Sequence, residues 1–243
     1  MPLRIGFDLD GTVADMYSAL HKEAIALFGE RVLERSANAK ARVMPEGAGD
    51  SSSEPAKSPT TVAMNELRLT SAEQDQLWGH VKKIENFWTT LPEMEPGIIS
   101  RIAKTAAKRQ WEIIFLTTRP STAGELTQLQ SQRWLDAHGF RYPSVMVVKR
   151  SRGRIADALQ LDAFVDDRPE NCLDIAVESK AKVILMWHGL LKDVPPGAKR
   201  LGVQAVTTIS EALALLERLD DVRNQPGIMR SLKRALGRGG ENS

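Results

Sequence analysis

Six short apolar segments, separated by stretches with helical periodicity, most constrain what this chain can fold into. They are residues 3–7, 111–116, 145–148, 163–165, 183–187 and 203–206. Runs of this length are typical of buried strands, and their alternation with helices predicts an α/β protein with a parallel, doubly wound sheet. Ligands of such sheets bind beyond the carboxyl ends of the strands, so the residues that follow each segment are the candidates for function.

Four of these strand ends carry polar or charged side chains. They are Asp8 and Asp10 after the first segment, Thr117 and Thr118 after the second, Lys149 after the third, and Asp166 and Asp167 after the fourth. Carboxylates that converge at one edge of a sheet repel each other, and a hard divalent cation such as Mg²⁺ offsets that repulsion by taking oxygen ligands. We therefore expect Mg²⁺ as the cofactor, with the four aspartates as its candidate ligands.

The same side chains could perform phosphoryl transfer. With the cation bound, Asp8 can attack phosphorus and form an aspartyl-phosphate. Asp10, two residues on, can protonate the leaving alkoxide and then activate water. Thr117 and Thr118 supply hydroxyl and backbone N–H donors to phosphate oxygens, and Lys149 would neutralise the charge that develops on the transferring group.

In order and spacing, these residues resemble the four motifs of the haloacid dehalogenase-like (HAD) hydrolases. The motifs are Asp8-Leu9-Asp10-Gly11-Thr12, Thr117, Lys149 and Asp166-Asp167, and the resemblance covers roughly residues 1–15 and 95–210. It implies a Rossmann-like core, Mg²⁺ and phosphomonoester hydrolysis, with Asp10 as the second aspartate of the phosphatase members.

A closer similarity is to the branch that contains the cytosolic-type 5′(3′)-deoxyribonucleotidases. It rests on Thr117-Thr118-Arg119-Pro120 and on residues 166–171, which read Asp-Asp-Arg-Pro-Glu-Asn. This similarity makes a nucleoside monophosphate the first substrate we expect. Arg119 and Arg168 flank the motifs. Each is either part of the site or an exposed ion-pair partner, and we assign neither to the site.

The third motif departs from the family pattern. Related proteins often place its lysine as Lys-Gly just before the helix, and that register here holds Arg152-Gly153. The phosphate-binding cation is therefore either Lys149 or Arg152. We expect Lys149, because it directly follows the strand.

About a hundred residues separate the ends of the first two strands, too many for a connecting loop in a compact domain. We predict a catalytic core over residues 1–15 and 95–220 and a small helical insert over 16–94, similar to the C1 cap of the family. Within the insert we expect disorder near residues 36–61, where Ala, Ser, Pro, Gly and Lys dominate. Residues 221–243 form a predicted basic C-terminal tail.

Two longer helices are predicted around the insert and the second strand. A capping box, Thr70 with Glu73, begins one whose apolar stripe reaches Trp88, and another spans about 122–138. Trp78, Phe87 and Trp88 belong either to the insert's core or to a surface that stacks on a base or sugar.

Composition and charge bear on the kind of partner and on the location of the protein. The 243 residues carry a net charge of +2, so no overall field favours nucleic acid. One cysteine, no secretory signal and no apolar stretch of membrane-spanning length predict a soluble, cytoplasmic protein. The resemblance to the HAD hydrolases implies a small phosphorylated substrate. The oligomeric state stays open. The alternatives are a non-catalytic binding or regulatory module on the same scaffold, and phosphoryl transfer to an acceptor other than water.

Overall fold

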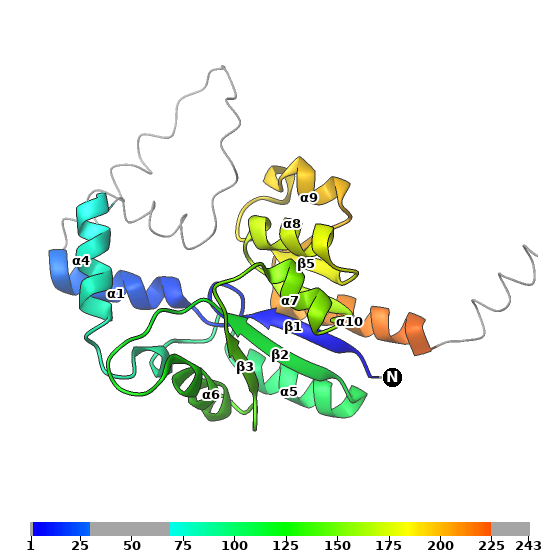
Figure 1. Ribbon diagram of the computed structural model, residues 1–243, viewed down its shortest axis with the longest axis horizontal. Helices are drawn as coiled ribbons and strands as arrows, with labels where there is room; N and C mark the ends of the chain where they lie inside the picture. The colour runs from blue at the N-terminus through cyan, green and yellow to red at the C-terminus, as the bar shows by residue number, and fades with distance from the viewer. Residues whose placement is uncertain (1, 30–68, 225–243) are drawn as a thin grey trace, which may run out of the picture.

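The computed structural model describes residues 2–29 and 69–224, and a six-stranded parallel sheet lies at its centre (Figure 1). Its strands are β1 (Arg4–Asp8), β2 (Glu112–Thr117), β3 (Ser144–Val147), β4 (Ala163–Asp166), β5 (Lys182–Met186) and β6 (Gln204–Val206). Their spatial order is β3-β2-β1-β4-β5-β6. All six predicted strands are present, and the predicted doubly wound α/β fold is confirmed.

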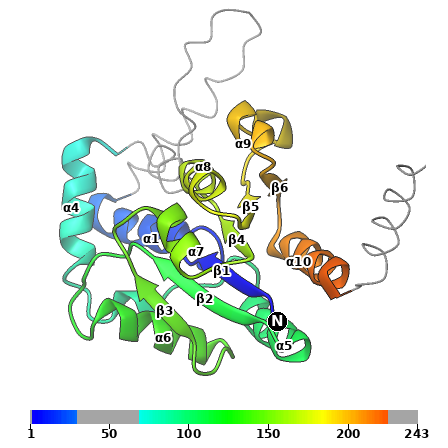
Figure 2. The same cartoon turned by 45° about the vertical axis from the view of Figure 1, so that its right-hand side comes forward.

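Helices cover both faces of this sheet (Figures 1 and 2). They are α1 (Met16–Phe28), α4 (Ser71–Val81), α5 (Ile98–Arg109), α6 (Thr127–Ala137), α7 (Arg152–Ala158), α8 (Pro169–Glu178), α9 (Pro196–Arg200) and α10 (Ile209–Asn224). Two 3₁₀ turns, η1 (Phe87–Thr89) and η2 (Leu191–Asp193), complete the described elements. Helix α9 and both 3₁₀ turns were not predicted from the sequence.

The two faces of the sheet form two apolar cores. Side chains of β1 such as Ile5 and Phe7 pack with those of α5 and α10 on one face. Phe164 of β4 packs with residues of α7 and α8 on the other face. Gly6 permits this second core, because a Cβ atom there would lie 2.4 Å from the ring of Phe164. The central strands are therefore held from both sides, and their carboxyl ends have fixed positions.

Two predicted helices are shorter in the structure than in the prediction, and two backbone hydrogen bonds between the segments explain both differences. The helix predicted from Thr70 to Trp88 ends at Val81, and the one predicted from 122 begins only at Thr127. Between them, the Ala123 N–H donates to the carbonyl of Lys82, and the Asn86 N–H donates to the carbonyl of Ala123. Backbone groups that bond across the two segments cannot continue their own helices.

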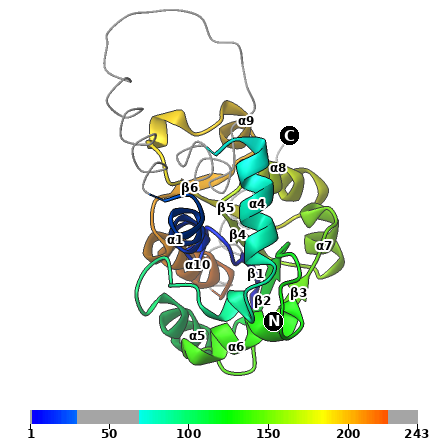
Figure 3. The same ribbon diagram turned by 90° about the vertical axis from the view of Figure 1, so that its left-hand side faces the viewer.

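The chain between β1 and α5 contains the described parts of the predicted insert. Helices α1 and α4 pack against each other, and Figure 3 shows them lying alongside one another. The stretch predicted to be disordered, 36–61, lies outside the described residues, as does the tail after Asn224. Helix α10 continues into the predicted tail and is described as far as Asn224. Within the described ranges, no helix is both long and apolar enough to cross a bilayer.

Candidate active site

The reversal of strand order around β1 brings two acidic strand ends together. Strands β2 and β4 flank β1 on either side, and Phe7 of β1 pairs with Val165 of β4. One residue further on, Asp8 and Asp166 follow at the carboxyl ends of these neighbouring strands. Asp8 is 5% exposed, and Asp166 is fully buried. This switch point is where doubly wound sheets bind ligands.

Asp8 is a buried carboxyl group held by one arginine. Nη2 of Arg152 donates to its Oδ1 over 2.7 Å. Burial raises the pKa of Asp8 well above its ordinary value, the neighbouring Asp166 raises it further, and Arg152 lowers it. Within the described chain, Oδ2 of Asp8 accepts no hydrogen bond, so one oxygen of this carboxyl group is free to react.

Arg152 reaches Asp8 because α7 begins in close contact with α8. Ser151 caps α7 and donates to Asp174 of α8, and the Gly153 N–H donates to the same carboxylate over 2.8 Å. A Cβ atom at position 153 would lie 2.3 Å from the Asp174 carbonyl oxygen, so only glycine allows this approach. The Arg-Gly pair thus combines a cation with the close packing that aims it.

The geometry does not support the expectation that Lys149 is the phosphate-binding cation. Lys149 is exposed, and among the described residues no contact links it to Asp8. Arg152 is 3% exposed and lines the same cavity as Asp8. The end of a strand fixes the position of the residues that follow it directly, but the Lys149 side chain is exposed, and it is Arg152, at the start of the next helix, that contacts Asp8.

Asp10 is held by a second arginine, Arg119. Nε of Arg119 donates to Oδ1 and Oδ2 of Asp10 over 2.9 and 3.0 Å, and Nη2 lies 2.7 Å from Oδ1. The hydroxyl of Thr117, predicted to bind phosphate, donates to Oδ2 of Asp10 over 3.1 Å. Thr118 is exposed and lines the cavity, so it can donate hydrogen bonds to the oxygens of a bound phosphate group.

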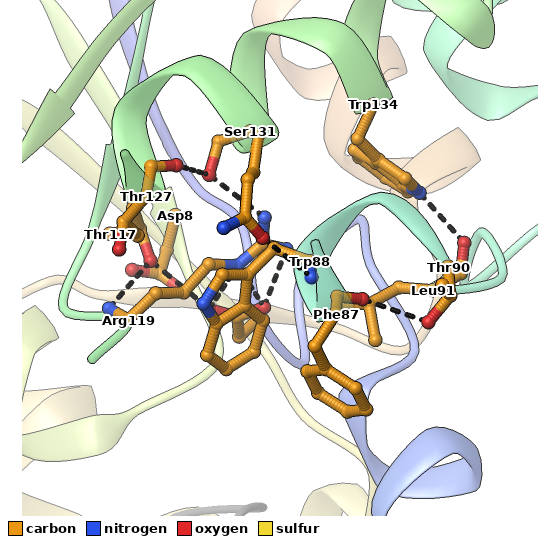
Figure 4. Close-up of polar contacts among 12 residues, drawn as sticks. Asp8, Phe87, Trp88, Thr90, Leu91, Thr117, Arg119, Thr127, Ser131 and Trp134 are labelled. Carbon is orange, nitrogen blue, oxygen red and sulfur yellow. Dashed lines mark hydrogen bonds and ion pairs between the residues drawn. The ribbon is translucent and has the colours of Figure 1, made fainter. Parts of the chain in front are cut away.

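Arg119 is the residue that the sequence interpretation missed. It is 2% exposed rather than a surface ion-pair partner, and it stacks near the rings of Trp88 and Trp134 (Figure 4). A signal existed: a carboxylate such as Asp10 at a buried strand end needs a counter-charge. Sequence alone does not show which arginine provides it.

The end of β4 holds two further aspartates in different surroundings. Asp166 accepts the backbone N–H of Arg168 over 2.8 Å and the side-chain amide of Asn171. Burial raises its pKa to about 6, against the lowering effects of Arg152 and of these hydrogen bonds. Asp167 is also fully buried, but neither of its carboxylate oxygens accepts a hydrogen bond from another residue of the described ranges. Burial, then Asp166 and Asp8, raise its pKa well above the ordinary value.

A cavity of about 260 Å³ opens onto Asp8 and Asp10. Its walls combine arginines and tryptophans: Trp78, Trp88, Arg119, Arg152 and Arg168, with Met16, Thr118, Pro120 and Asn171. Its acidic floor and cationic walls would accept a phosphorylated molecule of modest size together with a cation.

The donor set fits a divalent cation that keeps part of its water shell. Among the described residues, no three Asp, Glu, His or Cys side chains are grouped to hold a metal ion by themselves. Mg²⁺, however, is commonly bound by one or two carboxylates plus water and substrate phosphate. Asp8 and Asp166 offer such a pair, and the unpartnered oxygens of Asp167 favour positive charge nearby. The Asp10 carboxylate is already engaged by Arg119 and Thr117.

Comparisons with solved structures show which fold this is. A protein from Thermotoga maritima assigned as a beta-phosphoglucomutase matches with a TM-score of 0.50 and 16% identity, over 89% of this chain and 99% of the other. A HAD family hydrolase from Deinococcus radiodurans, with bound phosphate and sodium, matches with a TM-score of 0.50 and 13% identity, over 89% and 96%. The chain has the HAD hydrolase fold. No family model and no curated protein matches the sequence.

Proposed function

We propose that this protein is a Mg²⁺-dependent phosphomonoester hydrolase that works through an aspartyl-phosphate on Asp8. The observation that carries the proposal is the setting of Asp8, a buried carboxyl group at the switch point. Arg152 donates to its Oδ1, whereas its Oδ2 accepts no hydrogen bond from the described residues. The fold shared with a phosphate-binding HAD hydrolase supports it.

In the first half-reaction, Arg152 and Thr118 bind the phosphoryl oxygens, and an oxygen of Asp8 attacks phosphorus. The new P–O bond to Asp8 forms as the bond to the leaving alkoxide breaks, and that alkoxide takes a proton from Asp10. When bound, Mg²⁺ would supply charge neutralisation between the carboxylates and the phosphoryl group, held by Asp8 and Asp166.

In the second half-reaction, water attacks the phosphorus of the aspartyl-phosphate. Asp10 accepts the proton that water releases, inorganic phosphate leaves, and the carboxylate of Asp8 is regenerated. Asp10 therefore serves first as acid and then as base, as its place two residues from the nucleophile allows.

For the substrate we propose a nucleoside monophosphate, on the support of aromatic residues in the cavity. Trp88 is fully buried, and its Nε1 donates to the carbonyl of Pro120, so that side chain belongs to the structure. Trp78 is half-buried and lines the cavity, which leaves a ring for stacking on a base. Hydrolysis of nucleoside monophosphates should exceed that of sugar phosphates, and the preference should shrink in Trp78→Ala.

The test of the chemistry is phosphate release from p-nitrophenyl phosphate by the full chain with Mg²⁺. Asp8→Asn keeps the shape of the side chain and should lower turnover by about 10³-fold or more. Excess EDTA should abolish wild-type turnover, and added Mg²⁺ should restore it. Unchanged activity in Asp8→Asn would reject the nucleophile. No wild-type turnover on any phosphate ester would favour a non-catalytic binding module.

A further inference from the structure

We propose that Arg119 is the positioning residue of Asp10: it fixes the carboxylate that exchanges protons with leaving group and water, and it does not itself bind the transferring phosphoryl group. The inference rests on the proposed function above. It concerns a residue outside the four motifs, identified by its contacts alone.

The contacts on Asp10 fix the plane of its carboxylate. A carboxylate held at one oxygen can still turn about the Cβ–Cγ bond, whereas contacts at both oxygens prevent that rotation. Nε of Arg119 contacts both oxygens, and the Thr117 hydroxyl adds a donor to Oδ2. The Asp10 side chain stays 13% exposed, so the oriented group faces the cavity. Proton transfer depends steeply on such orientation.

Arg119 is itself held from four directions. Its guanidinium carbon lies 5.0 Å from the ring centre of Trp88 and 5.9 Å from that of Trp134. Nη1 donates to the hydroxyl of Ser131 over 3.0 Å, and the backbone N–H donates to Thr117 (Figure 4). A long side chain normally loses much rotational freedom when it makes a contact. Here the neighbours have already removed that freedom.

The two tryptophans are anchored independently of Arg119. Nε1 of Trp88 donates to Pro120, and Nε1 of Trp134 donates to the carbonyl of Leu91 over 2.7 Å. The aromatic walls should therefore persist when Arg119 is shortened. The space between them would then suit a free guanidinium ion.

Arg119 could instead contact the substrate phosphate directly, because it also lines the cavity. The contacts favour positioning. Nε of Arg119 donates to Asp10, its Nη1 donates to Ser131, and its Nη2 forms no hydrogen bond to a described residue but lies 2.7 Å from Oδ1 of Asp10 in an ion pair. Nη1 of the buried Arg152, by contrast, has neither a hydrogen bond nor an ion-pair contact within the described part of the chain. Arg152 thus has a donor to give a phosphoryl oxygen.

A double-mutant cycle separates these roles. In Arg119→Met we expect kcat for p-nitrophenyl phosphate to fall about 10- to 100-fold, with KM and the inhibition constant of inorganic phosphate within about twofold. Asp10→Ala should lower kcat similarly, and Arg119→Met should add no further loss in that background. Arg133→Ala removes an exposed arginine of α6 paired with Glu125 and should leave the kinetics unchanged.

Independent, multiplying losses in the double mutant would overturn the proposal. So would a rise in KM and in the phosphate inhibition constant that matches the fall in kcat, since both indicate direct phosphate binding. Melting curves establish that each variant is folded. If Arg119→Met is not, Arg119→Lys and the inhibition constant of phosphate decide instead, with the same expectation for positioning.

Rescue by a small molecule gives a second, independent measurement. Guanidinium chloride at millimolar concentration should restore part of kcat in Arg119→Ala, but none in Arg119→Ala combined with Asp10→Ala. Equal rescue in both backgrounds, or none in either, would overturn the proposal. The wild type and Asp8→Asn are measured alongside, so failure of the proposed function shows as absent wild-type turnover, which is distinct from failure of this inference.

Discussion

The candidate site contains two aspartate–arginine pairs that differ in how completely the carboxylate is held. Asp8 meets Arg152 through one oxygen at 2.7 Å, and its other oxygen accepts no hydrogen bond from the residues that the structure describes. Asp10 meets Arg119 through both oxygens and also accepts from Thr117. A nucleophile must release one oxygen to form a bond, whereas a proton-transfer group gains from a fixed orientation. The looser pair thus suits attack, and the tighter pair suits proton transfer.

The two arginines also come from different parts of the fold. Arg152 is fixed by contacts within the sheet's own helices, where α7 packs on α8. Arg119 lies against Trp88, which follows α4 in the predicted insert, and against Trp134 of α6. The first pair is therefore built by the core alone, and the second depends on the predicted insert, which also carries Trp78, the residue that we propose stacks on the substrate's base.

The largest expected effect comes from breaking the looser pair. Arg152→Met should lower kcat/KM for p-nitrophenyl phosphate by about 100-fold or more, because it removes the cation beside the nucleophile and the phosphoryl group. Both KM and the inhibition constant of inorganic phosphate should rise. That pattern is the opposite of the one expected for Arg119→Met.

Lys149→Met is the matched control for this change. It removes one positive charge a short distance away along the chain, from an exposed side chain, and should alter kcat/KM by less than about twofold. If Lys149→Met abolished activity and Arg152→Met did not, the motif assignment would have to return to the lysine.

The part of the site that the sequence could predict is the part that lies at the ends of parallel strands. Asp8 and Asp166 were predictable because parallel strands carry their terminal residues to a common edge whatever the loops do. Arg152 was only the second choice for the cation, and Arg119 was left outside the site, because an arginine side chain spans several ångströms and its direction depends on packing. That packing involves Trp88, Trp134 and Gly153, residues far apart in the chain whose contacts no local pattern shows.

The prediction of where the helices end was wrong for a related reason. Glu73 and Thr70 correctly predicted where α4 begins, since a capping box is a local interaction. Its end depends on Asn86, which adopts a left-handed conformation and accepts the N–H of Glu125 over 2.9 Å. Long-range bonds of this kind override helical periodicity.

A smaller effect should follow from crowding the turn beside the two pairs. Gly11 has a φ of +80°, and a Cβ atom there would lie 2.1 Å from Oδ2 of Asp167. Gly97 has a similar φ of +78° in a left-handed conformation, and a Cβ atom there would meet no described atom within 4 Å. Gly97→Ala should cost about 1 kcal/mol of unfolding free energy from backbone strain alone. Gly11→Ala should cost about 2–4 kcal/mol, because the clash adds to that strain.

Chemical denaturation measures both glycine variants. Equal losses would mean that Asp167 moves aside without cost, and hence that its position against Gly11 is loosely held. A larger loss for Gly11→Ala would establish that this carboxylate is fixed in place, as the carboxylates of the two pairs are.

The smallest effect tests an aspartate that pairs with no arginine among the described residues. Both oxygens of Asp167 are buried and accept no hydrogen bond from another described residue, so no contact compensates its ionised form in the metal-free protein. Asp167→Asn removes the charge and nearly keeps the shape, and in EDTA it should stabilise the fold by about 1 kcal/mol, seen as a melting temperature some 2–4 °C higher. Asp162→Asn is the control, because that carboxylate accepts the Arg4 N–H and pairs with Arg223. The same substitution there should destabilise the protein. A lower melting temperature for Asp167→Asn would mean that its oxygens have partners, and that the contrast between held and unheld carboxylates is wrong at this position.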